Sequence, residues 1–401
     1  MVDNLPAHSP LGASGAERWM NCPASVTLSQ GHQDEESEHA SLGTAAHAIA
    51  EHCLRNNVAP WTLPIGWWFS ELGIHYHDIG DKMSVCIDQE MIDAITVYVD
   101  FLAEEFPDRN QGNFWVERRL HCPTIHPLFF GTSDACGIID ERTASVVDYK
   151  HGAGIVVEAE DNEQLMYYAC GVLEDLNLWG KVDDVRLTIV QPRAFHFDGP
   201  VRTHTMKVED LIAWLEEKLV PAMDKAAQGS RDTKSGSHCR FCPARSAACP
   251  QILSDVKELE ALMEKLDGGA GAAKMTNEDL ARFLDLGEVF KIARTAALKT
   301  ATARVEHGAL VPGWKLAKAR SNSEFKDGAE KEAKKKFGDD AYTKPELLSP
   351  AQIKKLPGGE DFCARWAHKP DKGLTLVQAD DARPAVNKDV KSHFKATRKP
   401  K

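Results

Sequence analysis

The sequence contains no apolar run long enough to cross a membrane, and we expect no secretory leader. A membrane-spanning helix needs about 20 consecutive apolar residues, and charged residues, which make up 27% of the chain, interrupt every apolar segment before that length. The first residues, MVDNLPAHSPLGASGAERW, also lack the basic and then apolar pattern of a signal peptide. We therefore expect a cytoplasmic protein without a membrane partner.

Positive charge is also scarce. The chain has 48 Lys and Arg against 60 Asp and Glu, a formal net charge of −12. A nucleic-acid-binding protein usually carries a basic surface, so this balance counts against such a partner. Binding nonetheless needs only a local basic patch, and the tail 388–401 holds six Lys and Arg with one acid. The composition therefore leaves DNA open as a partner.

The chain is long enough for more than one domain. It has 401 residues, 43% of them hydrophobic, and domains usually contain about 100–200 residues. A glycine- and alanine-rich joint at 267–273 divides the sequence. We predict a first domain over 1–265 and a smaller, mostly helical second domain over 275–401 with a basic tail. In the second domain, 276–306 and the lysine-rich 327–337 are predicted helices.

Residues 131–150 have the pattern of a strand hairpin that carries acids near its open end. Two apolar segments flank a short polar turn at 140–143. Asp134 precedes the first segment and Asp148 follows the second, so antiparallel pairing brings the two carboxylates together. Lys150 shares the face of Asp148, because alternate side chains of a strand point the same way.

This pattern of two acids and a lysine has a chemical meaning. Two carboxylates a few ångströms apart repel each other unless a cation lies between them. Mg²⁺ and Mn²⁺ are bound in this way, with phosphate oxygens as further ligands. A bound metal generates hydroxide, and an ammonium group stabilises charge on the attacked phosphate. Each residue alone is more often an ordinary turn, helix or surface residue, but the combination indicates phosphodiester hydrolysis.

The same residues match a known family. Asp134 with Asp148-Tyr149-Lys150 resembles the core of the PD-(D/E)xK nucleases. Gln164 and Tyr168 lie four residues apart on an expected helix and share a face, which resembles the QLxxY helix of the RecB-like exonucleases. Upstream, the segment GTAAH, which ends at His47, is similar to the metal-binding histidine motif of that branch. Thr44 of this segment is expected to cap a helix that ends near Leu54.

The resemblance implies a restriction-endonuclease-like α/β fold, with a mixed central sheet flanked by helices. It implies a metal-dependent exonuclease that acts on DNA ends in recombination, repair or replication. Its Mg²⁺ or Mn²⁺ ligands would be His47, Asp134, Asp148 and the backbone carbonyl of Tyr149. Lys150 would orient water and stabilise the transition state. Gln164 and Tyr168 would position the DNA strand or the attacking water.

Some points stay open on the sequence alone. Glu117, on a strand expected over 114–120, is either a further metal-binding acid or part of the polar face of that strand. The alternative function is a non-catalytic scaffold that binds DNA ends and retains the nuclease fold. A single-strand DNA-binding or annealing protein is a candidate partner beside DNA. The whole chain looks like a phage-encoded relative of these exonucleases.

Ten cysteines in a reducing compartment are better candidates for metal ligands than for disulfides. Cys239, Cys242 and Cys249 form a close trio, and metal clusters and zinc sites usually take four ligands. Cys22 is the predicted fourth ligand, with Cys122 as its rival. The arrangement resembles the iron–sulfur clasp of AddB-type exonucleases, which implies a [4Fe–4S] cluster; zinc is the alternative.

Overall fold

The structure is a computed structural model of the chain. It describes residues 6, 8–31, 38–70, 73–77, 84–107, 112–196, 198–246, 249–267, 275–319, 323–326, 328–343, 346–348, 350–354, 356–368 and 374–378. The chain divides into two compact units, unit 1 over 1–290 and unit 2 over 291–401. This division falls within the long helix α9 (Asn277–Glu306). The joint at 267–273 lies almost wholly outside the described residues, and the domain boundary predicted there stays a prediction.

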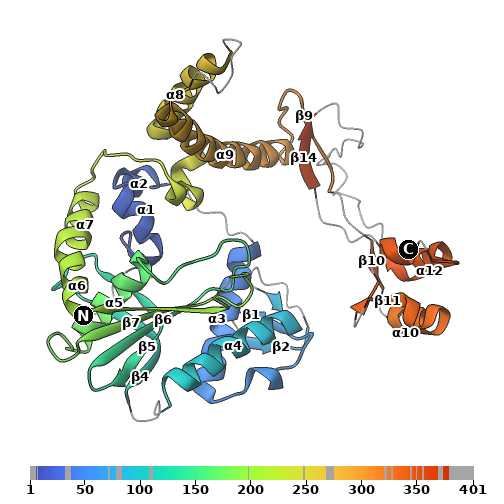
Figure 1. Ribbon diagram of the computed structural model, residues 1–401, viewed down its shortest axis with the longest axis horizontal. Coiled ribbons are helices and arrows are strands. Elements are labelled where there is room, and N and C mark those ends of the chain that lie inside the picture. The colour runs from blue at the N-terminus through green and yellow to red at the C-terminus, as the bar shows by residue number, and fades with distance from the viewer. Residues whose placement is uncertain are drawn as a thin grey trace, which may run out of the picture. The chain divides into compact units, whose positions relative to one another are not determined.

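Unit 1 is built on a five-stranded mixed sheet in the order β4-β5-β6-β7-β8 (Figure 1). Its strands are β4 (Phe114–His121), β5 (Phe130–Asp140), β6 (Thr143–Tyr149), β7 (Asp184–Val190) and β8 (Val201–Lys207). All neighbours are antiparallel except β6 and β7, which are parallel and are joined through helix α5 (Glu163–Asp175). The predicted hairpin is confirmed: β5 turns into β6 where the Arg142 N–H donates to Asp140 at 2.8 Å.

Alternate residues of the sheet enter two separate cores, one on each face. Cys136 and Val146 pack with α5, and Ala135 and Val147 pack into the other core. On the α5 face lie also α1 (Ala16–Asn21), α6 (Val208–Trp214) and α7 (Val220–Ala227), and on the opposite face lie α3 (Glu38–Asn56) and α4 (Gln89–Glu105). This sheet between layers of helices confirms the predicted mixed α/β class.

One local prediction is wrong. Thr44 does not begin a helix; it lies inside α3, and its hydroxyl donates to the Ala40 carbonyl one turn earlier at 3.1 Å. A threonine hydroxyl can bond the preceding turn in this way instead of capping. His47 therefore lies in the middle of a helix of 19 residues, where its backbone is held on both sides.

Unit 1 contains further elements, all of them short except the 18-residue helix α8. They are η1 (Ala13–Gly15), α2 (Ala24–Leu28), η2 (Pro60–Thr62), β1 (Trp68–Ser70), β2 (Gly73–His75), β3 (Val85–Cys86), the π-helical turn η4 (Leu215–Leu219), η5 (Ser237–Phe241), η6 (Pro243–Ser246) and α8 (Pro250–Asp267). Strands β2, β1 and β3 form a separate small sheet. Helices α8 and α9 contact each other through Leu259, Leu262 and Leu286.

Unit 2 is largely helical and has a small core of its own, formed by residues such as Ala333, Ile353 and Phe362. Besides the end of α9, its elements are β9 (Trp314–Lys318), β10 (Glu324–Phe325), α10 (Ala329–Phe337), η8 (Gly338–Ala341), β11 (Tyr342–Thr343), β12 (Glu346–Leu347), α11 (Pro350–Ile353), α12 (Gly359–Trp366), β13 (Ala367–His368) and β14 (Leu374–Gln378). The tail 388–401 lies outside the described residues. Across the described part of both units, no helix has the length and apolar character that a membrane span needs.

Candidate active site and cysteine cluster

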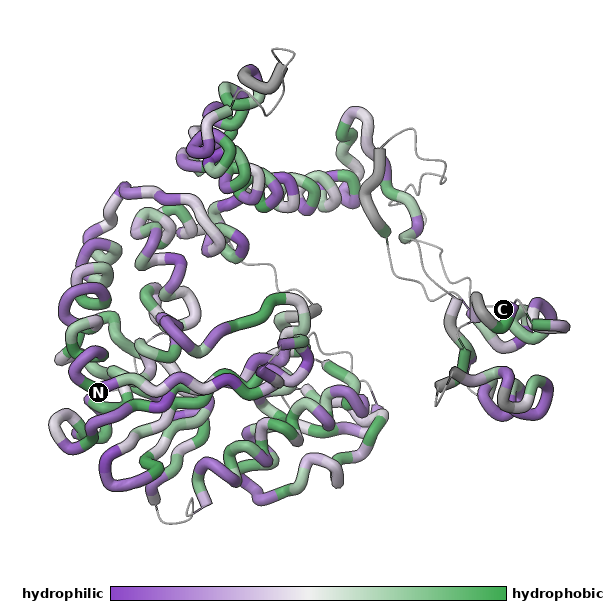
Figure 2. Tube along the Cα trace, in the orientation of Figure 1, coloured by the Kyte–Doolittle hydropathy of each residue, from purple (hydrophilic) through white to green (hydrophobic). Residues whose placement is uncertain are grey.

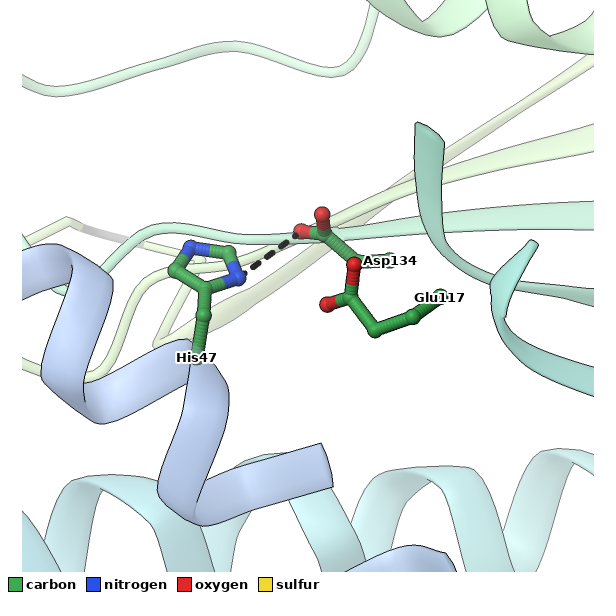
Figure 3. A group of neighbouring side chains, drawn as sticks. All are labelled: His47, Glu117 and Asp134. Atoms are coloured by element: carbon green, nitrogen blue, oxygen red, sulfur yellow. Dashed lines mark ion pairs between the residues drawn. The ribbon is translucent and has the colours of Figure 1, made fainter. Parts of the chain in front are cut away.

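Three potential metal ligands from three elements meet at one point of unit 1. His47 comes from α3, Glu117 from β4 and Asp134 from β5, and one ligand atom of each lies within 4.8 Å of the other two (Figure 3). The Nδ1 atom of His47 is 3.6 Å from Oδ2 of Asp134. Imidazole nitrogen and carboxylate oxygen are ligand types that divalent metals accept. These three side chains, called the ligand cluster below, can hold one cation.

Glu117 reaches the ligand cluster by an unusual backbone conformation. The pairs Val116–Ala135 and Arg118–Ser133 flank it, which places Glu117 opposite Asp134 in the register of β4 and β5. Its φ is +47°, in a region that residues other than glycine occupy at a cost of about 1–3 kcal/mol. The sequence left two interpretations open for Glu117, a metal-binding acid or part of the polar face of the strand. This geometry favours the first, because it places the Glu117 carboxylate with the other two potential ligands.

The ligand cluster concentrates negative charge. Burial, together with the nearby Asp134 and Glu51 carboxylates, raises the pKa of Glu117 to about 8. Such a shift means that the ionised form lacks a counter-charge in this environment. A divalent cation would supply that charge, so the residues fit a metal ion.

Asp148, Lys150 and Gln164 form a closed hydrogen-bonded triangle beside the ligand cluster. The Lys150 ammonium donates to Asp148 Oδ1 at 3.2 Å and to Gln164 Oε1 at 2.9 Å. The Gln164 amide donates to Asp148 Oδ1 at 2.7 Å. Burial acts to lower the Lys150 pKa, but the Asp148 and Asp134 carboxylates outweigh it and raise the pKa above its usual value. Lys150 is therefore held as a cation.

The second oxygen of Asp148 is buried and forms an ion pair with Lys150. Its side chain is 3% exposed, and Oδ2 lies 2.9 Å from the Lys150 nitrogen. Among the described residues, Oδ2 is a buried oxygen that receives no hydrogen bond and is satisfied by the ion pair with Lys150 alone. Asp148 is not one of the three residues of the ligand cluster. Its Oδ2, which receives no hydrogen bond from the described residues, is nevertheless the kind of atom that a bound cation would satisfy.

Tyr149 connects the ligand cluster to the core. Its N–H donates to Asp134 Oδ2 at 2.8 Å, and its ring meets the His47 ring edge-on with centroids 5.3 Å apart. Behind it, the Tyr98 ring stacks at 4.9 Å, and the Tyr149 hydroxyl hydrogen-bonds His151 Nδ1 at 2.8 Å. The structure thus shows the side chain and N–H of Tyr149 in supporting contacts; metal ligation by its carbonyl stays a prediction.

Helix α5 brings Gln164 and Tyr168 to the same site. Asn162 caps the helix by accepting the Leu165 N–H at 3.0 Å. Close packing of α5 on the sheet depends on Gly171, where an added Cβ would lie 2.9 Å from Leu120 and Phe129 side-chain atoms. Tyr168 is buried, and burial raises its pKa, with Asp134 and Asp148 adding to the effect. Its hydroxyl thus stays protonated near the two acids.

The structure also shows supporting residues that no sequence motif indicates. Tyr98 and His151 hold Tyr149 from two sides, and Arg193 donates to the His151 carbonyl at 3.2 Å. Neither Tyr98 nor Arg193 is close in sequence to the acids. Only their packing in the folded chain gives them a role at the site.

The predicted cysteine ligands come together where the N-terminal segment meets residues 237–249. Burial raises the pKa of Cys22, and the nearby Cys242 and Cys249 thiols add to the effect. Burial also raises the pKa of Cys239 to about 11, with Cys242, Cys22 and Cys249 contributing. The N-terminal segment is fixed there because the Ala24 N–H donates to the Asp232 carbonyl at 3.1 Å.

Cys122, the rival fourth ligand, lies elsewhere. Its thiol donates to the Gly171 carbonyl at 3.5 Å, and its acidic neighbours are Asp175 and Glu174. The four predicted cysteines are thus grouped without Cys122. Among the described residues, no three cysteine sulfurs lie within 4.8 Å of one another.

A comparison with known protein families matches nearly the whole chain to one family. The match runs over residues 8–384 and thus includes the ligand cluster, the triangle, the cysteines and most of unit 2. It covers nearly the entire chain rather than the sheet of unit 1 alone. The chain belongs to the DUF2800 family, which is described as a family of proteins of unknown function.

Proposed function

We propose that this protein is a metal-dependent deoxyribonuclease of the PD-(D/E)xK type that degrades DNA from its ends. One observation carries the proposal: the His47–Glu117–Asp134 ligand cluster lies beside a buried acid and a lysine that is held as a cation. Metal ligands next to a fixed ammonium group are the combination that phosphodiester hydrolysis needs.

The residues divide the chemistry between them. His47, Glu117 and Asp134 would hold Mg²⁺ or Mn²⁺, and Oδ2 of Asp148, which receives no hydrogen bond from the described residues, would be a further ligand. The metal, when bound, supplies a Lewis acid and lowers the pKa of water. Lys150 stabilises negative charge on the attacked phosphate. Gln164 keeps both Asp148 and Lys150 in place through its two hydrogen bonds, and Tyr168 presents a neutral hydroxyl.

The cysteines support a structural role for a second metal group. Cys22 and Cys239 each lie close enough to Cys242 and Cys249 for these thiols to raise their pKa, and one metal group bound by all four would offset that repulsion. Zinc is the alternative to an iron–sulfur cluster. Cys22, Cys239, Cys242 and Cys249 would hold a [4Fe–4S] cluster that fastens the N-terminal segment to the end of the nuclease fold.

Digestion of end-labelled linear DNA and of covalently closed circular DNA, each with Mg²⁺, Mn²⁺ or EDTA, tests the proposed activity. We expect linear DNA to be degraded with either metal, circles to be spared, and EDTA to stop the reaction. Rapid linearisation of circles would show an endonuclease instead. Tight binding to DNA ends without cleavage under any condition would establish the non-catalytic scaffold.

A further inference from the structure

The charge of the chain is divided very unequally between its two units. Of the 60 acidic residues, 46 lie in unit 1 and 14 in unit 2, whereas the 48 Lys and Arg divide into 23 and 25. Unit 1 thus has a formal charge of −23 and unit 2 one of +11. The net charge of −12 conceals a basic unit attached to a strongly acidic one.

Positive charge that could attract DNA is scarce around the site in unit 1. Four cations on or next to the elements that build the site are paired with acids, Arg55 with Glu51, Arg118 with Asp175, Lys150 with Asp148 and Arg193 with Glu90, and Arg119 of β4 donates to the Pro6 carbonyl. A duplex carries one negative charge per about 1.7 Å of its axis. An acidic unit repels such a polymer, so its cleavage requires attraction from another part of the chain.

Unit 2 presents cations on one face of a short helix. Helix α10 packs into the core of unit 2 through Ala329 and Ala333, and Lys331, Lys334 and Lys335 are exposed. Residues three and four apart lie on the same side of a helix, so these three lysines share one face. Figure 2 colours much of α10 as hydrophilic.

The helix macrodipole accounts for only part of this pattern. Cations are favoured in the last turn of a helix, which suits Lys334 and Lys335. Lys331 lies in the first turn of α10, where the dipole disfavours a cation. A ligand with several negative charges accounts for all three lysines together.

We propose that unit 2 is the part of this protein that binds the DNA phosphate backbone, with Lys331, Lys334 and Lys335 of α10 in contact with phosphates. This inference rests on the proposed nuclease function for the identity of the polyanion. Unit 2 supplies affinity that does not depend on sequence, and unit 1 supplies the chemistry. Binding by such contacts weakens steeply with salt, because each contact releases counterions.

Binding of the full chain to a short fluorescent duplex, measured in EDTA over a series of NaCl concentrations, tests the proposal. The variant Lys331→Gln/Lys334→Gln/Lys335→Gln should weaken binding at least about 10-fold near 0.1 M salt, and loss of three contacts should reduce the salt slope by up to about 2.7. The matched control, Lys181→Gln/Lys218→Gln/Lys257→Gln, removes the same charge from exposed positions of unit 1. It should change affinity less than two-fold, on the order of experimental scatter.

The proposal would be overturned if both variants weakened DNA binding equally, or if neither variant weakened it. So would a fall in self-association with unchanged DNA binding in the α10 variant, because the basic unit would then bind the acidic unit of a second copy. The assay needs no cleavage. If no metal supports hydrolysis but the α10 variant loses binding, the nuclease function fails while the DNA-binding role of unit 2 stands.

Discussion

The backbone N–H of Tyr149 donates to Asp134 Oδ2 at 2.8 Å, so the end of β6 holds the acid of β5 in place. The Tyr149 ring also contacts His47. One residue therefore supports two of the three members of the ligand cluster. This leaves the carboxylate of Asp134 with a fixed orientation before any cation binds.

Replacement of the central charged residues should abolish cleavage. Asp134→Ala, Asp148→Ala and Lys150→Ala each remove a ligand or the cation that stabilises the transition state, and such losses cost about 100-fold or more in rate. Thermal unfolding should show that each variant still folds. Rates like those of the wild type in any two of the variants would remove the basis of the proposed site.

Replacement of Glu117 should abolish activity, and replacement by glycine should also relieve backbone strain. Glu117→Gly relieves the positive φ, worth about 1–3 kcal/mol, against a backbone entropy cost of about 0.5–1 kcal/mol for glycine. The matched Glu117→Gln keeps the strained φ and removes the charge. We expect both variants to lose metal-dependent cleavage, measured on linear DNA. In denaturant unfolding Glu117→Gly should be the more stable of the two, and the reverse order would show that the backbone is not strained.

Tyr98 should support the site through its ring, which stacks on Tyr149, and not through its hydroxyl. The hydroxyl is buried and has no hydrogen-bond partner among the described residues, a state that costs about 1–3 kcal/mol. Tyr98→Phe should therefore raise the free energy of unfolding by about 1 kcal/mol and leave cleavage unchanged. Tyr98→Ala removes the stack behind Tyr149 and should cost about 3–5 kcal/mol.

The metal dependence of the two Tyr98 variants provides a further measurement. If the ring supports Tyr149 and His47, Tyr98→Ala should require more Mn²⁺ for half-maximal cleavage. An unchanged metal requirement in Tyr98→Ala would limit the role of this ring to general core packing.

The cysteine cluster should be needed for stability. Protein purified without oxygen should be brown, and Cys22→Ser, Cys239→Ser, Cys242→Ser or Cys249→Ser should each lose colour and unfold at a lower temperature. Ligation that joins distant segments closes a long loop, and its binding energy adds to folding. Cys122→Ser, whose thiol contacts Gly171, should keep the colour. If metal analysis of the purified protein found one equivalent of zinc and no iron, the four cysteines would form a zinc site and not an iron–sulfur cluster.

Much of the site could be predicted from short motifs. The hairpin that carries Asp134 and Asp148 follows from two apolar segments around a polar turn, and the spacing of Gln164 and Tyr168 follows from helical periodicity. The choice of Cys22 over Cys122 agrees with the grouping of thiols in the structure. The capping role predicted for Thr44 was wrong, because local sequence does not show that α3 begins further upstream.

The sequence by itself determined the mixed α/β class, the order of the elements that carry the acids, the lysine and the histidine, and the division of charge along the chain. These depend on local periodicity and composition, which the chain carries in every conformation. Only the tertiary structure decided that Glu117 joins His47 and Asp134, that Gln164 links Lys150 to Asp148, and that Tyr98 and His151 hold Tyr149. Apart from the contact of His151 with Tyr149, these contacts join residues that lie far apart in the chain, and the position of Glu117 also depends on one strained φ. Packing of α3, α4 and α5 on the two faces of the sheet creates them, and no local pattern encodes that packing.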